Sequence, residues 1–262
     1  MTGPEKTRRR TLAMMFSALL AGFLLGGLVA GRFMKTRDGH RAPPQPNDAA
    51  LVRLLLDEKL SERTFDFATV AEACSGKRVL PLGHDPAHRR VVAAIEQALV
   101  QTIREMNAAD SPVRKLRRIN EASRFFEDGL LSRLNAVPGL SCGTPSTRAG
   151  AAQRSGYPDL RIVDEASGTV FYLDPKLVEQ GSESSTLRTF YFEPKNETLK
   201  ITDDAVHLLV GIEHDGRDGE WTFGGWRLVD LSQLQVRLKA EFQASNAALY
   251  RKSALSLPPE SR

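Results

Sequence analysis

The chain has 262 residues, which is enough for one or two domains with a sizeable core. Apolar residues make up 41% and charged residues 26% of the chain, a balance that excludes a wholly disordered or fibrous protein. Its two cysteines exclude a disulfide-dense scaffold and a four-cysteine zinc site. Most of the formal net charge of +4 lies within the first 31 residues, so the rest of the chain is nearly neutral and gives no charge-based argument for nucleic-acid binding.

The N-terminal segment has the pattern of a membrane anchor. Residues 11–31 carry no charged side chain and follow four cations, Lys6 and Arg8 to Arg10. Roughly 20 helical residues at about 1.5 Å each span a bilayer core of about 30 Å. The same pattern is typical of a cleaved export signal, so we expect a single-pass membrane protein or an exported one. Cations flank both ends of the segment and leave its orientation open, and an extracytoplasmic soluble domain is the preferred expectation.

A Pro-rich linker over 32–47 leads into a predicted helical region over 48–110. Within it, the apolar spacing predicts a helix over 49–60, and the pair Asp85 and Pro86 predicts the start of a helix that runs to about Asn107. The pair Ser111 and Pro112 repeats this start signal, for a helix that runs to about Asn135.

The chain changes character from Tyr157 onwards. Five short apolar runs alternate with turn residues and predict five strands: LRIV, TVFYL, TFYF, HLLVGI and WRLVDL. A final amphipathic helix is predicted over 232–251, followed by a disordered tail over 252–262. Helices followed by strands and a last helix predict an α/β or α+β fold with a mixed sheet, in a domain that covers about 111–251.

Two acidic residues stand in neighbouring predicted strands. A turn-like segment centred on Ala166 and Ser167 separates the two strands, so a hairpin would pair residues whose numbers sum to 333. That register places Asp159 opposite Asp174, with Cβ atoms about 5 Å apart. Lys176 shares the face of Asp174, because side chains alternate along a strand. Two facing carboxylates repel each other unless one takes up a proton or a hard cation such as Mg²⁺ binds between them.

A third acid, Glu127, lies within the apolar stripe of the helix predicted over 112–135. At 100° per residue it lies near the angle of Leu134, whereas Glu121 and Asp128 project to the polar side. A glutamate in an apolar stripe is costly unless it is paired or binds a metal ion. The alternative is a glutamate at the stripe edge that extends to water.

These residues resemble a known family. Pro158-Asp159, followed by Asp174-x-Lys176 at the end of the next strand, is similar to the signature of the PD-(D/E)xK, or restriction-endonuclease-like, nucleases. The resemblance covers about 112–251 and implies a helix followed by a three-stranded meander. It implies that Asp159 and Asp174 bind Mg²⁺, that Glu127 assists them, and that Lys176 positions or activates the attacking water. The implied activity is metal-assisted hydrolysis of phosphodiester bonds, with nucleic acid as the partner.

Two features depart from that pattern. Pro175 stands where the family usually has an aliphatic residue, and because proline cannot donate a ladder hydrogen bond, it predicts a strand edge or a bulge. A membrane-attached chain is also an unusual setting for such a nuclease. The rival hypothesis is therefore a non-catalytic, membrane-tethered binding domain on the same fold. Oligomeric state stays open, as does whether Cys74 and Cys142 form a disulfide or are free thiols.

Overall fold

The computed structural model describes residues 47–60, 62–182, 184–185, 190–193, 195–217, 219–239, 241 and 243–245. The predicted anchor over 11–31, the linker over 32–46 and the tail over 252–262 lie outside the described residues. Within the part that is described, no helix combines the length and the apolar character needed to cross a membrane.

The chain divides into two compact units. The first, Met1–Asp57, contributes helix α2 (Asp48–Asp57), which confirms the helix predicted over 49–60. None of the residues of α2 is buried, and Leu51, Leu54 and Leu56 are exposed. The second unit, Glu58–Arg262, contains the mixed sheet and the helices that cover it.

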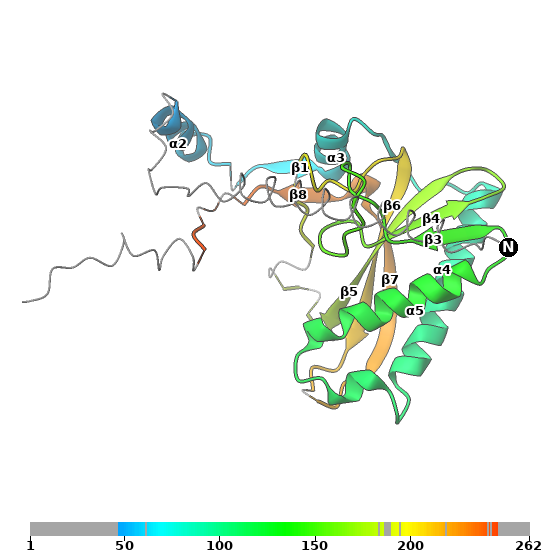
Figure 1. Ribbon diagram of the computed structural model, residues 1–262. Coiled ribbons are helices and arrows are strands. Elements are labelled where there is room, and N and C mark those ends of the chain that lie inside the picture. Colours follow the sequence, from blue (N-terminus) through cyan, green and yellow to red (C-terminus); the bar gives the residue numbers. More distant parts are fainter. Residues whose placement is uncertain are drawn as a thin grey trace, which may run out of the picture. The chain divides into compact units, whose positions relative to one another are not determined.

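A six-stranded mixed sheet forms the centre of the second unit (Figure 1). The strands β2 (Val79–Leu80), β6 (Ala205–His214), β5 (Val170–Glu179), β4 (Leu160–Asp164) and β3 (Leu140–Gly143) lie in that order. Strand β7 (Phe223–Asp230) also pairs with β6. The pairs β2–β6 and β5–β6 are parallel and the others are antiparallel, which confirms the predicted mixed α/β class.

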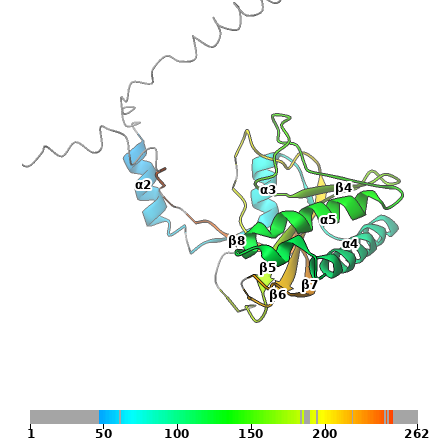
Figure 2. The ribbon, with the colours of Figure 1, turned by 60° about the horizontal axis from the view of Figure 1, so that its bottom comes forward.

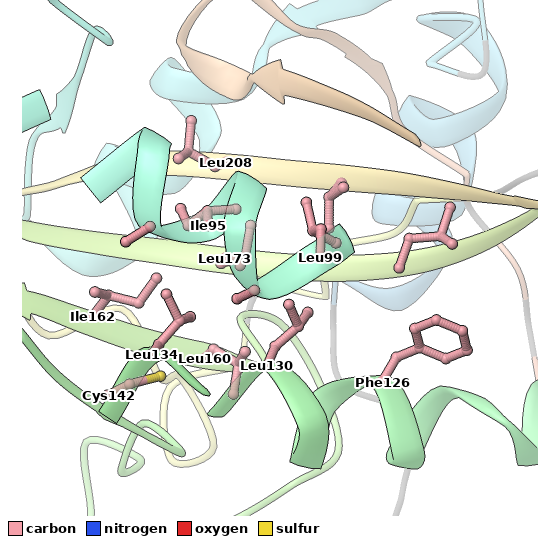
Figure 3. Close-up of a cluster of buried hydrophobic side chains, with 14 of the residues drawn as sticks. Ile95, Leu99, Phe126, Leu130, Leu134, Cys142, Leu160, Ile162, Leu173 and Leu208 are labelled. Carbon is pink, nitrogen blue, oxygen red and sulfur yellow. The ribbon is translucent and has the colours of Figure 1, made fainter. Parts of the chain in front are cut away.

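Two helices cover one face of this sheet, as Figures 1 and 2 show. They are α4 (Pro86–Met106) and α5 (Ser123–Asn135). The apolar side chains of both helices join those of the strands in the larger core, where Ile95, Leu130 and Leu173 are fully buried (Figure 3). The predicted start of α4 is confirmed, because the Asp85 carboxylate accepts hydrogen bonds from the backbone of Ala87 and His88.

The opposite face of the sheet packs against α3 (Phe67–Ser75) and a smaller core. Phe67 and Tyr172 are fully buried there. A two-stranded sheet of β1 (Thr64–Asp66) and β8 (Gln235–Arg237) adjoins α3. The short 3₁₀ turn Leu231–Gln233 connects β7 to β8 and adds Leu231 to the same core.

The helix predicted over 112–135 is wrong in its first half. The structure has two 3₁₀ turns there, Pro112–Lys115 and Ile119–Glu121, before α5 begins at Ser123. Ser111 does cap the first turn, but Leu116 is extended and its carbonyl accepts a hydrogen bond from the Trp221 indole at 2.9 Å. Four cations within five residues also disfavour a continuous helix, because like charges repel along it.

Two further predictions need correction. The run TFYF is not a strand in its described part, and Phe190 and Phe192 pack instead around the rings of Phe67 and Tyr157. The helix predicted over 232–251 is wrong where the structure describes it, because Gln235–Arg237 is strand β8. Its partner β1 lies about 170 positions earlier in the chain, a pairing that no local pattern contains. Residues 246–251 lie outside the described part.

Both cysteines are free thiols. Cys142 is buried in the core beneath α5, whereas Cys74 lies on α3, which packs on the other face of the sheet. Burial raises the pKa of the Cys142 thiol to about 12. Of the two alternatives that the sequence left open, the structure has the free thiols.

Candidate active site

The β4–β5 hairpin has the register that the sequence predicts. Leu160 pairs with Leu173 and Ile162 pairs with Phe171, so the pairing that places Asp159 opposite Asp174 continues one step beyond the start of β4. The turn is fixed by the buried Asp164 carboxylate, which accepts hydrogen bonds from the backbone and hydroxyl of Ser167. The hairpin therefore delivers the two acids to one place.

Lys176 joins the acid pair. Its ammonium nitrogen lies 2.5 Å from Oδ2 of Asp174 and 3.4 Å from Oδ2 of Asp159. The side chain of Asp174 is 2% exposed, that of Asp159 13% and that of Lys176 24%. Lys176 is therefore the most accessible member of the cluster, and Asp174 is the least accessible. The structure thus brings these three predicted residues together.

Strand β5 continues past the end of β4, and this opens the site. The last β4–β5 pair is Leu160 with Leu173, whereas β5 stays paired with β6 as far as Glu179. Pro175 lies in this stretch, which agrees with the strand edge that a proline predicts. The β4 side of Asp174 and Lys176 is therefore free of a ladder partner, and side chains from other segments meet there.

Burial and like charge act together on Asp159. Burial and then the charge of Asp174 raise its pKa to about 7, although Lys176 and Lys200 act in the opposite direction. For Lys176, burial alone would lower the pKa, but the charges of Asp174 and Asp159 outweigh it and raise the pKa overall. A carboxyl that titrates near neutrality beside a protonated lysine is typical of a functional site.

The donor set suits a hard divalent cation. Both acids offer oxygen, and Mg²⁺ is commonly held by one or two carboxylates while it keeps several waters. The buried Oδ2 atom of Asp174 is paired with the Lys176 ammonium, so a bound cation would share this carboxylate with Lys176.

Glu127 projects from α5 toward the same region but does not join the acid pair directly. Its carboxylate pairs with Arg154 at 3.1 Å, and its side chain is 19% exposed. Burial, followed by the charge of Asp159, raises its pKa. Among the described residues, no three His, Cys, Asp or Glu side chains lie close enough to hold a metal ion together. Glu127 is thus a neighbour of the acid pair.

A pocket lies between α5 and the acid pair. It is lined by Glu127, Asp128, Leu131, Thr144, Arg154, Asp159 and Leu160. The Asp159 side chain is 13% exposed, so this carboxylate is the more accessible member of the acid pair.

Two cations at the site were not predicted from the sequence. Lys200 is fully buried, and its ammonium donates to the backbone carbonyls of Gln153 and Arg154 at 3.2 and 3.4 Å. Burial lowers its pKa, whereas the charges of Asp159, Asp174 and Glu127 act to raise it. The signal for Lys200 was its position between the apolar residues Leu199 and Ile201. For Arg154 the sequence offers no comparable signal.

A buried aromatic network supports the segment that leads to Asp159. The Tyr157 hydroxyl and Nδ1 of His207 share a hydrogen bond of 2.7 Å, and the two rings are stacked. Burial lowers the pKa of His207 to about 3, so the imidazole is neutral. Its Nε2 atom has no hydrogen-bond partner among the described residues. His207 is a buried residue of strand β6.

Comparison with known proteins adds independent findings. Residues 59–253 match the model of a family described as the type II restriction enzyme MjaV family. The chain is also 31% identical over 202 residues to a protein named type II restriction enzyme MjaV from Methanocaldococcus jannaschii. That alignment covers 72% of this chain and 86% of the relative. The matched range contains Glu127, Asp159, Asp174 and Lys176.

Proposed function

Because the chain belongs to the MjaV family of type II restriction enzymes, we propose that it is a metal-dependent endonuclease that hydrolyses phosphodiester bonds in double-stranded DNA. The relative's name supports the substrate, and the family membership supports the reaction. The observation that carries the assignment of the site is the contact of Lys176 with both Asp174 and Asp159 at the open edge of the hairpin.

Asp159 and Asp174 are the residues that would hold the metal ion. When bound, Mg²⁺ supplies charge neutralisation at the phosphate and lowers the pKa of a coordinated water. Asp174 is the better buried of the two acids and is fixed within β5, whereas Asp159 faces the pocket. The pair therefore combines a rigid ligand with an accessible one. Glu127 lies farther from the pair and would act through water or through Arg154.

Lys176 supplies a point charge beside the acids. In the absence of metal, the charges of Asp174 and Asp159 raise the pKa of its ammonium group. A positive charge at this position would stabilise negative charge on a phosphate. The ammonium lies between two carboxylates, and the Lys176 side chain is still 24% exposed. From this position it would contact a phosphate oxygen or a nucleophilic water bound beside the two carboxylates.

The finer assignment is to the PD-(D/E)xK class. Support comes from the order Pro158-Asp159, then Asp174-x-Lys176, on two strands of one hairpin, with a helix bearing Glu127 before them. Asp159 directly precedes β4 and Asp174 lies within β5, an arrangement that supports this assignment. Pro175 between Asp174 and Lys176 remains the departure from the pattern.

Cleavage of supercoiled plasmid DNA tests the proposal. The full chain should convert plasmid to linear fragments with MgCl₂ and not with EDTA, and Asp174→Asn should lose at least a hundredfold in rate. Asp204→Asn is the matched control, since Asp204 is an exposed carboxylate paired with Arg78 on the surface. Cleavage that persists undiminished in Asp174→Asn would remove the proposed site.

One observation favours the rival, non-catalytic function. The ion pair of Lys176 with Asp174 already satisfies both charges without a metal ion. In that case the cluster is a structural ion pair, and the chain binds DNA or another partner without cutting it. The plasmid assay separates the two functions, because a binding domain shifts the plasmid in a gel and leaves it intact with Mg²⁺.

We also propose that residues 11–31 attach the protein to a membrane or direct its export, with the soluble domain extracytoplasmic. The uncharged, apolar run that follows four cations supports this. The test is fractionation of cells that produce the full chain or a chain starting at Glu58. Attachment predicts that only the full chain sediments with membranes after alkaline extraction. Equal partition of both chains into the soluble fraction would contradict it.

A further inference from the structure

Arg154 places a guanidinium group at the entrance to the site. Its Nη2 atom lies 3.1 Å from a carboxylate oxygen of Glu127 and 2.8 Å from one of Asp128. The side chain is 55% exposed and lines the same pocket as Asp159. Arg154 is therefore an exposed cation beside Asp159 that an approaching DNA backbone could reach.

Most of the hydrogen-bonding capacity of this guanidinium is unused. An arginine has five N–H donors, and the two on Nη2 are directed at Glu127 and Asp128. The Nε and Nη1 atoms donate to no acceptor among the described residues. The free donors lie on an always-charged planar group, which is the preferred protein partner of a phosphate.

The backbone beneath Arg154 is held in place from inside the protein. The buried Lys200 ammonium donates to the carbonyls of Gln153 and Arg154. The segment is thus anchored to the residues that precede β6, while the Arg154 side chain stays exposed. A fixed backbone with an accessible cation lowers the conformational cost of binding an anion.

Arg154 also offsets the negative charge of the acidic residues around it. Glu127, Asp128 and Asp159 all line the pocket and would repel a phosphodiester. Arg154 pairs with two of these three acids. It is therefore the group of the pocket lining that offsets this repulsion, since the other lining residues, Leu131, Thr144 and Leu160, carry no charge.

From this geometry we propose that Arg154 binds a phosphate of the DNA backbone beside the acid pair and so positions the duplex for cleavage. The inference rests on the proposed function and deepens it, because it names a substrate-binding residue at the same site. The competing role is a clamp that only orients Glu127. A residue that only orients Glu127 would affect the Mg²⁺ concentration that cleavage requires. A residue that contacts a phosphate would affect the affinity for DNA in the absence of metal.

Binding of a fluorescein-labelled duplex of mixed sequence, in EDTA and across a KCl series, tests the proposal. Loss of one phosphate contact lowers the slope of log K against log[KCl] by about 0.9. Arg154→Ala should show this decrease together with several-fold weaker binding, and Arg154→Lys should recover most of the slope because it keeps the charge. Arg63→Ala is the matched control, because Arg63 has a 54% exposed side chain and pairs with Glu58, outside the pocket.

The outcomes are distinct. A salt slope and affinity in Arg154→Ala equal to those of the wild type would overturn the proposal, even if the variant needs more Mg²⁺ for cleavage. Equal losses in Arg154→Ala and Arg63→Ala would overturn it too, since net charge would then explain both, as would a wild type that does not bind the duplex. Failure of the proposed function is a separate result: a wild type that binds the duplex but does not cleave plasmid with Mg²⁺.

Discussion

Burial and a neighbouring negative charge together shift the pKa of Asp159. Its pKa of about 7 lies well above that of an exposed aspartate, because burial and Asp174 disfavour its charged form. The native protein thus binds a proton there between about pH 4 and 7, a range in which the unfolded chain has released it. By linkage, the stability that this group contributes is present below about pH 4 and is lost as the pH rises to 7.

The consequence is a testable pH dependence. In EDTA, the free energy of unfolding should fall from about pH 5.5 to 8 by roughly 1 to 3 kcal/mol more in the wild type than in Asp159→Asn. Mg²⁺ should stabilise the wild type more at pH 8, because protons compete with metal for carboxylates. Denaturant titrations at both pH values measure this. If the free energy of unfolding changed with pH equally in the two proteins, the raised pKa of Asp159 would be contradicted.

Lys200 acts on the same acid from inside the fold. Its charge lowers the pKa of Asp159, although burial and Asp174 outweigh that effect. Replacement by methionine keeps much of the side chain's volume and removes the charge. Lys200→Met should therefore move the acidic limb of the pH–rate profile for plasmid cleavage to higher pH and lower the rate at neutral pH by about tenfold. Lys200→Arg tests whether charge alone restores the profile, and an unchanged limb in Lys200→Met would exclude the electrostatic role.

At the level of elements, the contact between α4 and α5 determines where Glu127 lies. Gly129 faces Thr102 across this contact, and a Cβ atom on Gly129 would lie 2.8 Å from the Thr102 methyl carbon. Thr102 is fully buried, and its hydroxyl has no hydrogen-bond partner among the described residues. The glycine therefore permits the two helices to approach closely, at a cost in helix propensity of about 1 kcal/mol.

A double-mutant cycle tests this packing. Gly129→Ala should destabilise the protein by about 1 to 2 kcal/mol, because overpacking outweighs the gain in helix propensity. In a Thr102→Ala background the same change should be neutral or stabilising, since the clashing methyl and the unpaired hydroxyl are gone. Urea titrations of the four proteins give the coupling energy. Additive changes in the free energy of unfolding would show that Gly129 and Thr102 do not contact each other.

The elements differ in how far the sequence predicts them. The β4–β5 hairpin was predictable to the residue because its turn, its alternation and its register are all local. Helix α4 was predictable because Asp85 and Pro86 mark its start. The break before α5 depends on the Trp221 indole, and β8 depends on β1, so both are set by partners more than 100 residues away.

The same distinction applies to the site. Asp159, Asp174 and Lys176 come from one hairpin, so local rules place them together. Helical periodicity put Glu127 in the apolar stripe of its helix, and only the family resemblance implied that it lies near the acids. Its pairing with Arg154 was not predictable, because residues 144–159 contain no helix or strand that would fix their path. Lys200 lies 41 residues after Asp159 and 26 after Asp174, and only the fold brings it to the site.

On the scale of the whole molecule, the family match and the contact-based division of the chain agree. The match begins at residue 59 and the second unit begins at Glu58. The proposed catalytic residues and their supporting core all lie in that unit. We therefore expect the first 57 residues to be dispensable for the chemistry.

Truncation tests this expectation. A chain that starts at Glu58 should fold with a single cooperative transition and cleave plasmid with Mg²⁺ within about threefold of the full chain, because its core is complete. Circular dichroism melts and the plasmid assay measure the two properties. A folded but inactive truncated chain would mean that residues before Glu58 take part in catalysis or in binding DNA.

The central claim is that Asp159 and Asp174 jointly bind a divalent cation beside Lys176. A crystal structure with Mn²⁺, recorded at a wavelength where manganese scatters anomalously, tests it most directly. If the two carboxylates hold the cation, one anomalous peak should lie within coordination distance of an oxygen of each carboxylate, and no such peak should appear in Asp174→Asn. Crystals soaked in Mn²⁺ that show no peak there, with Lys176 still bridging both acids, would contradict it.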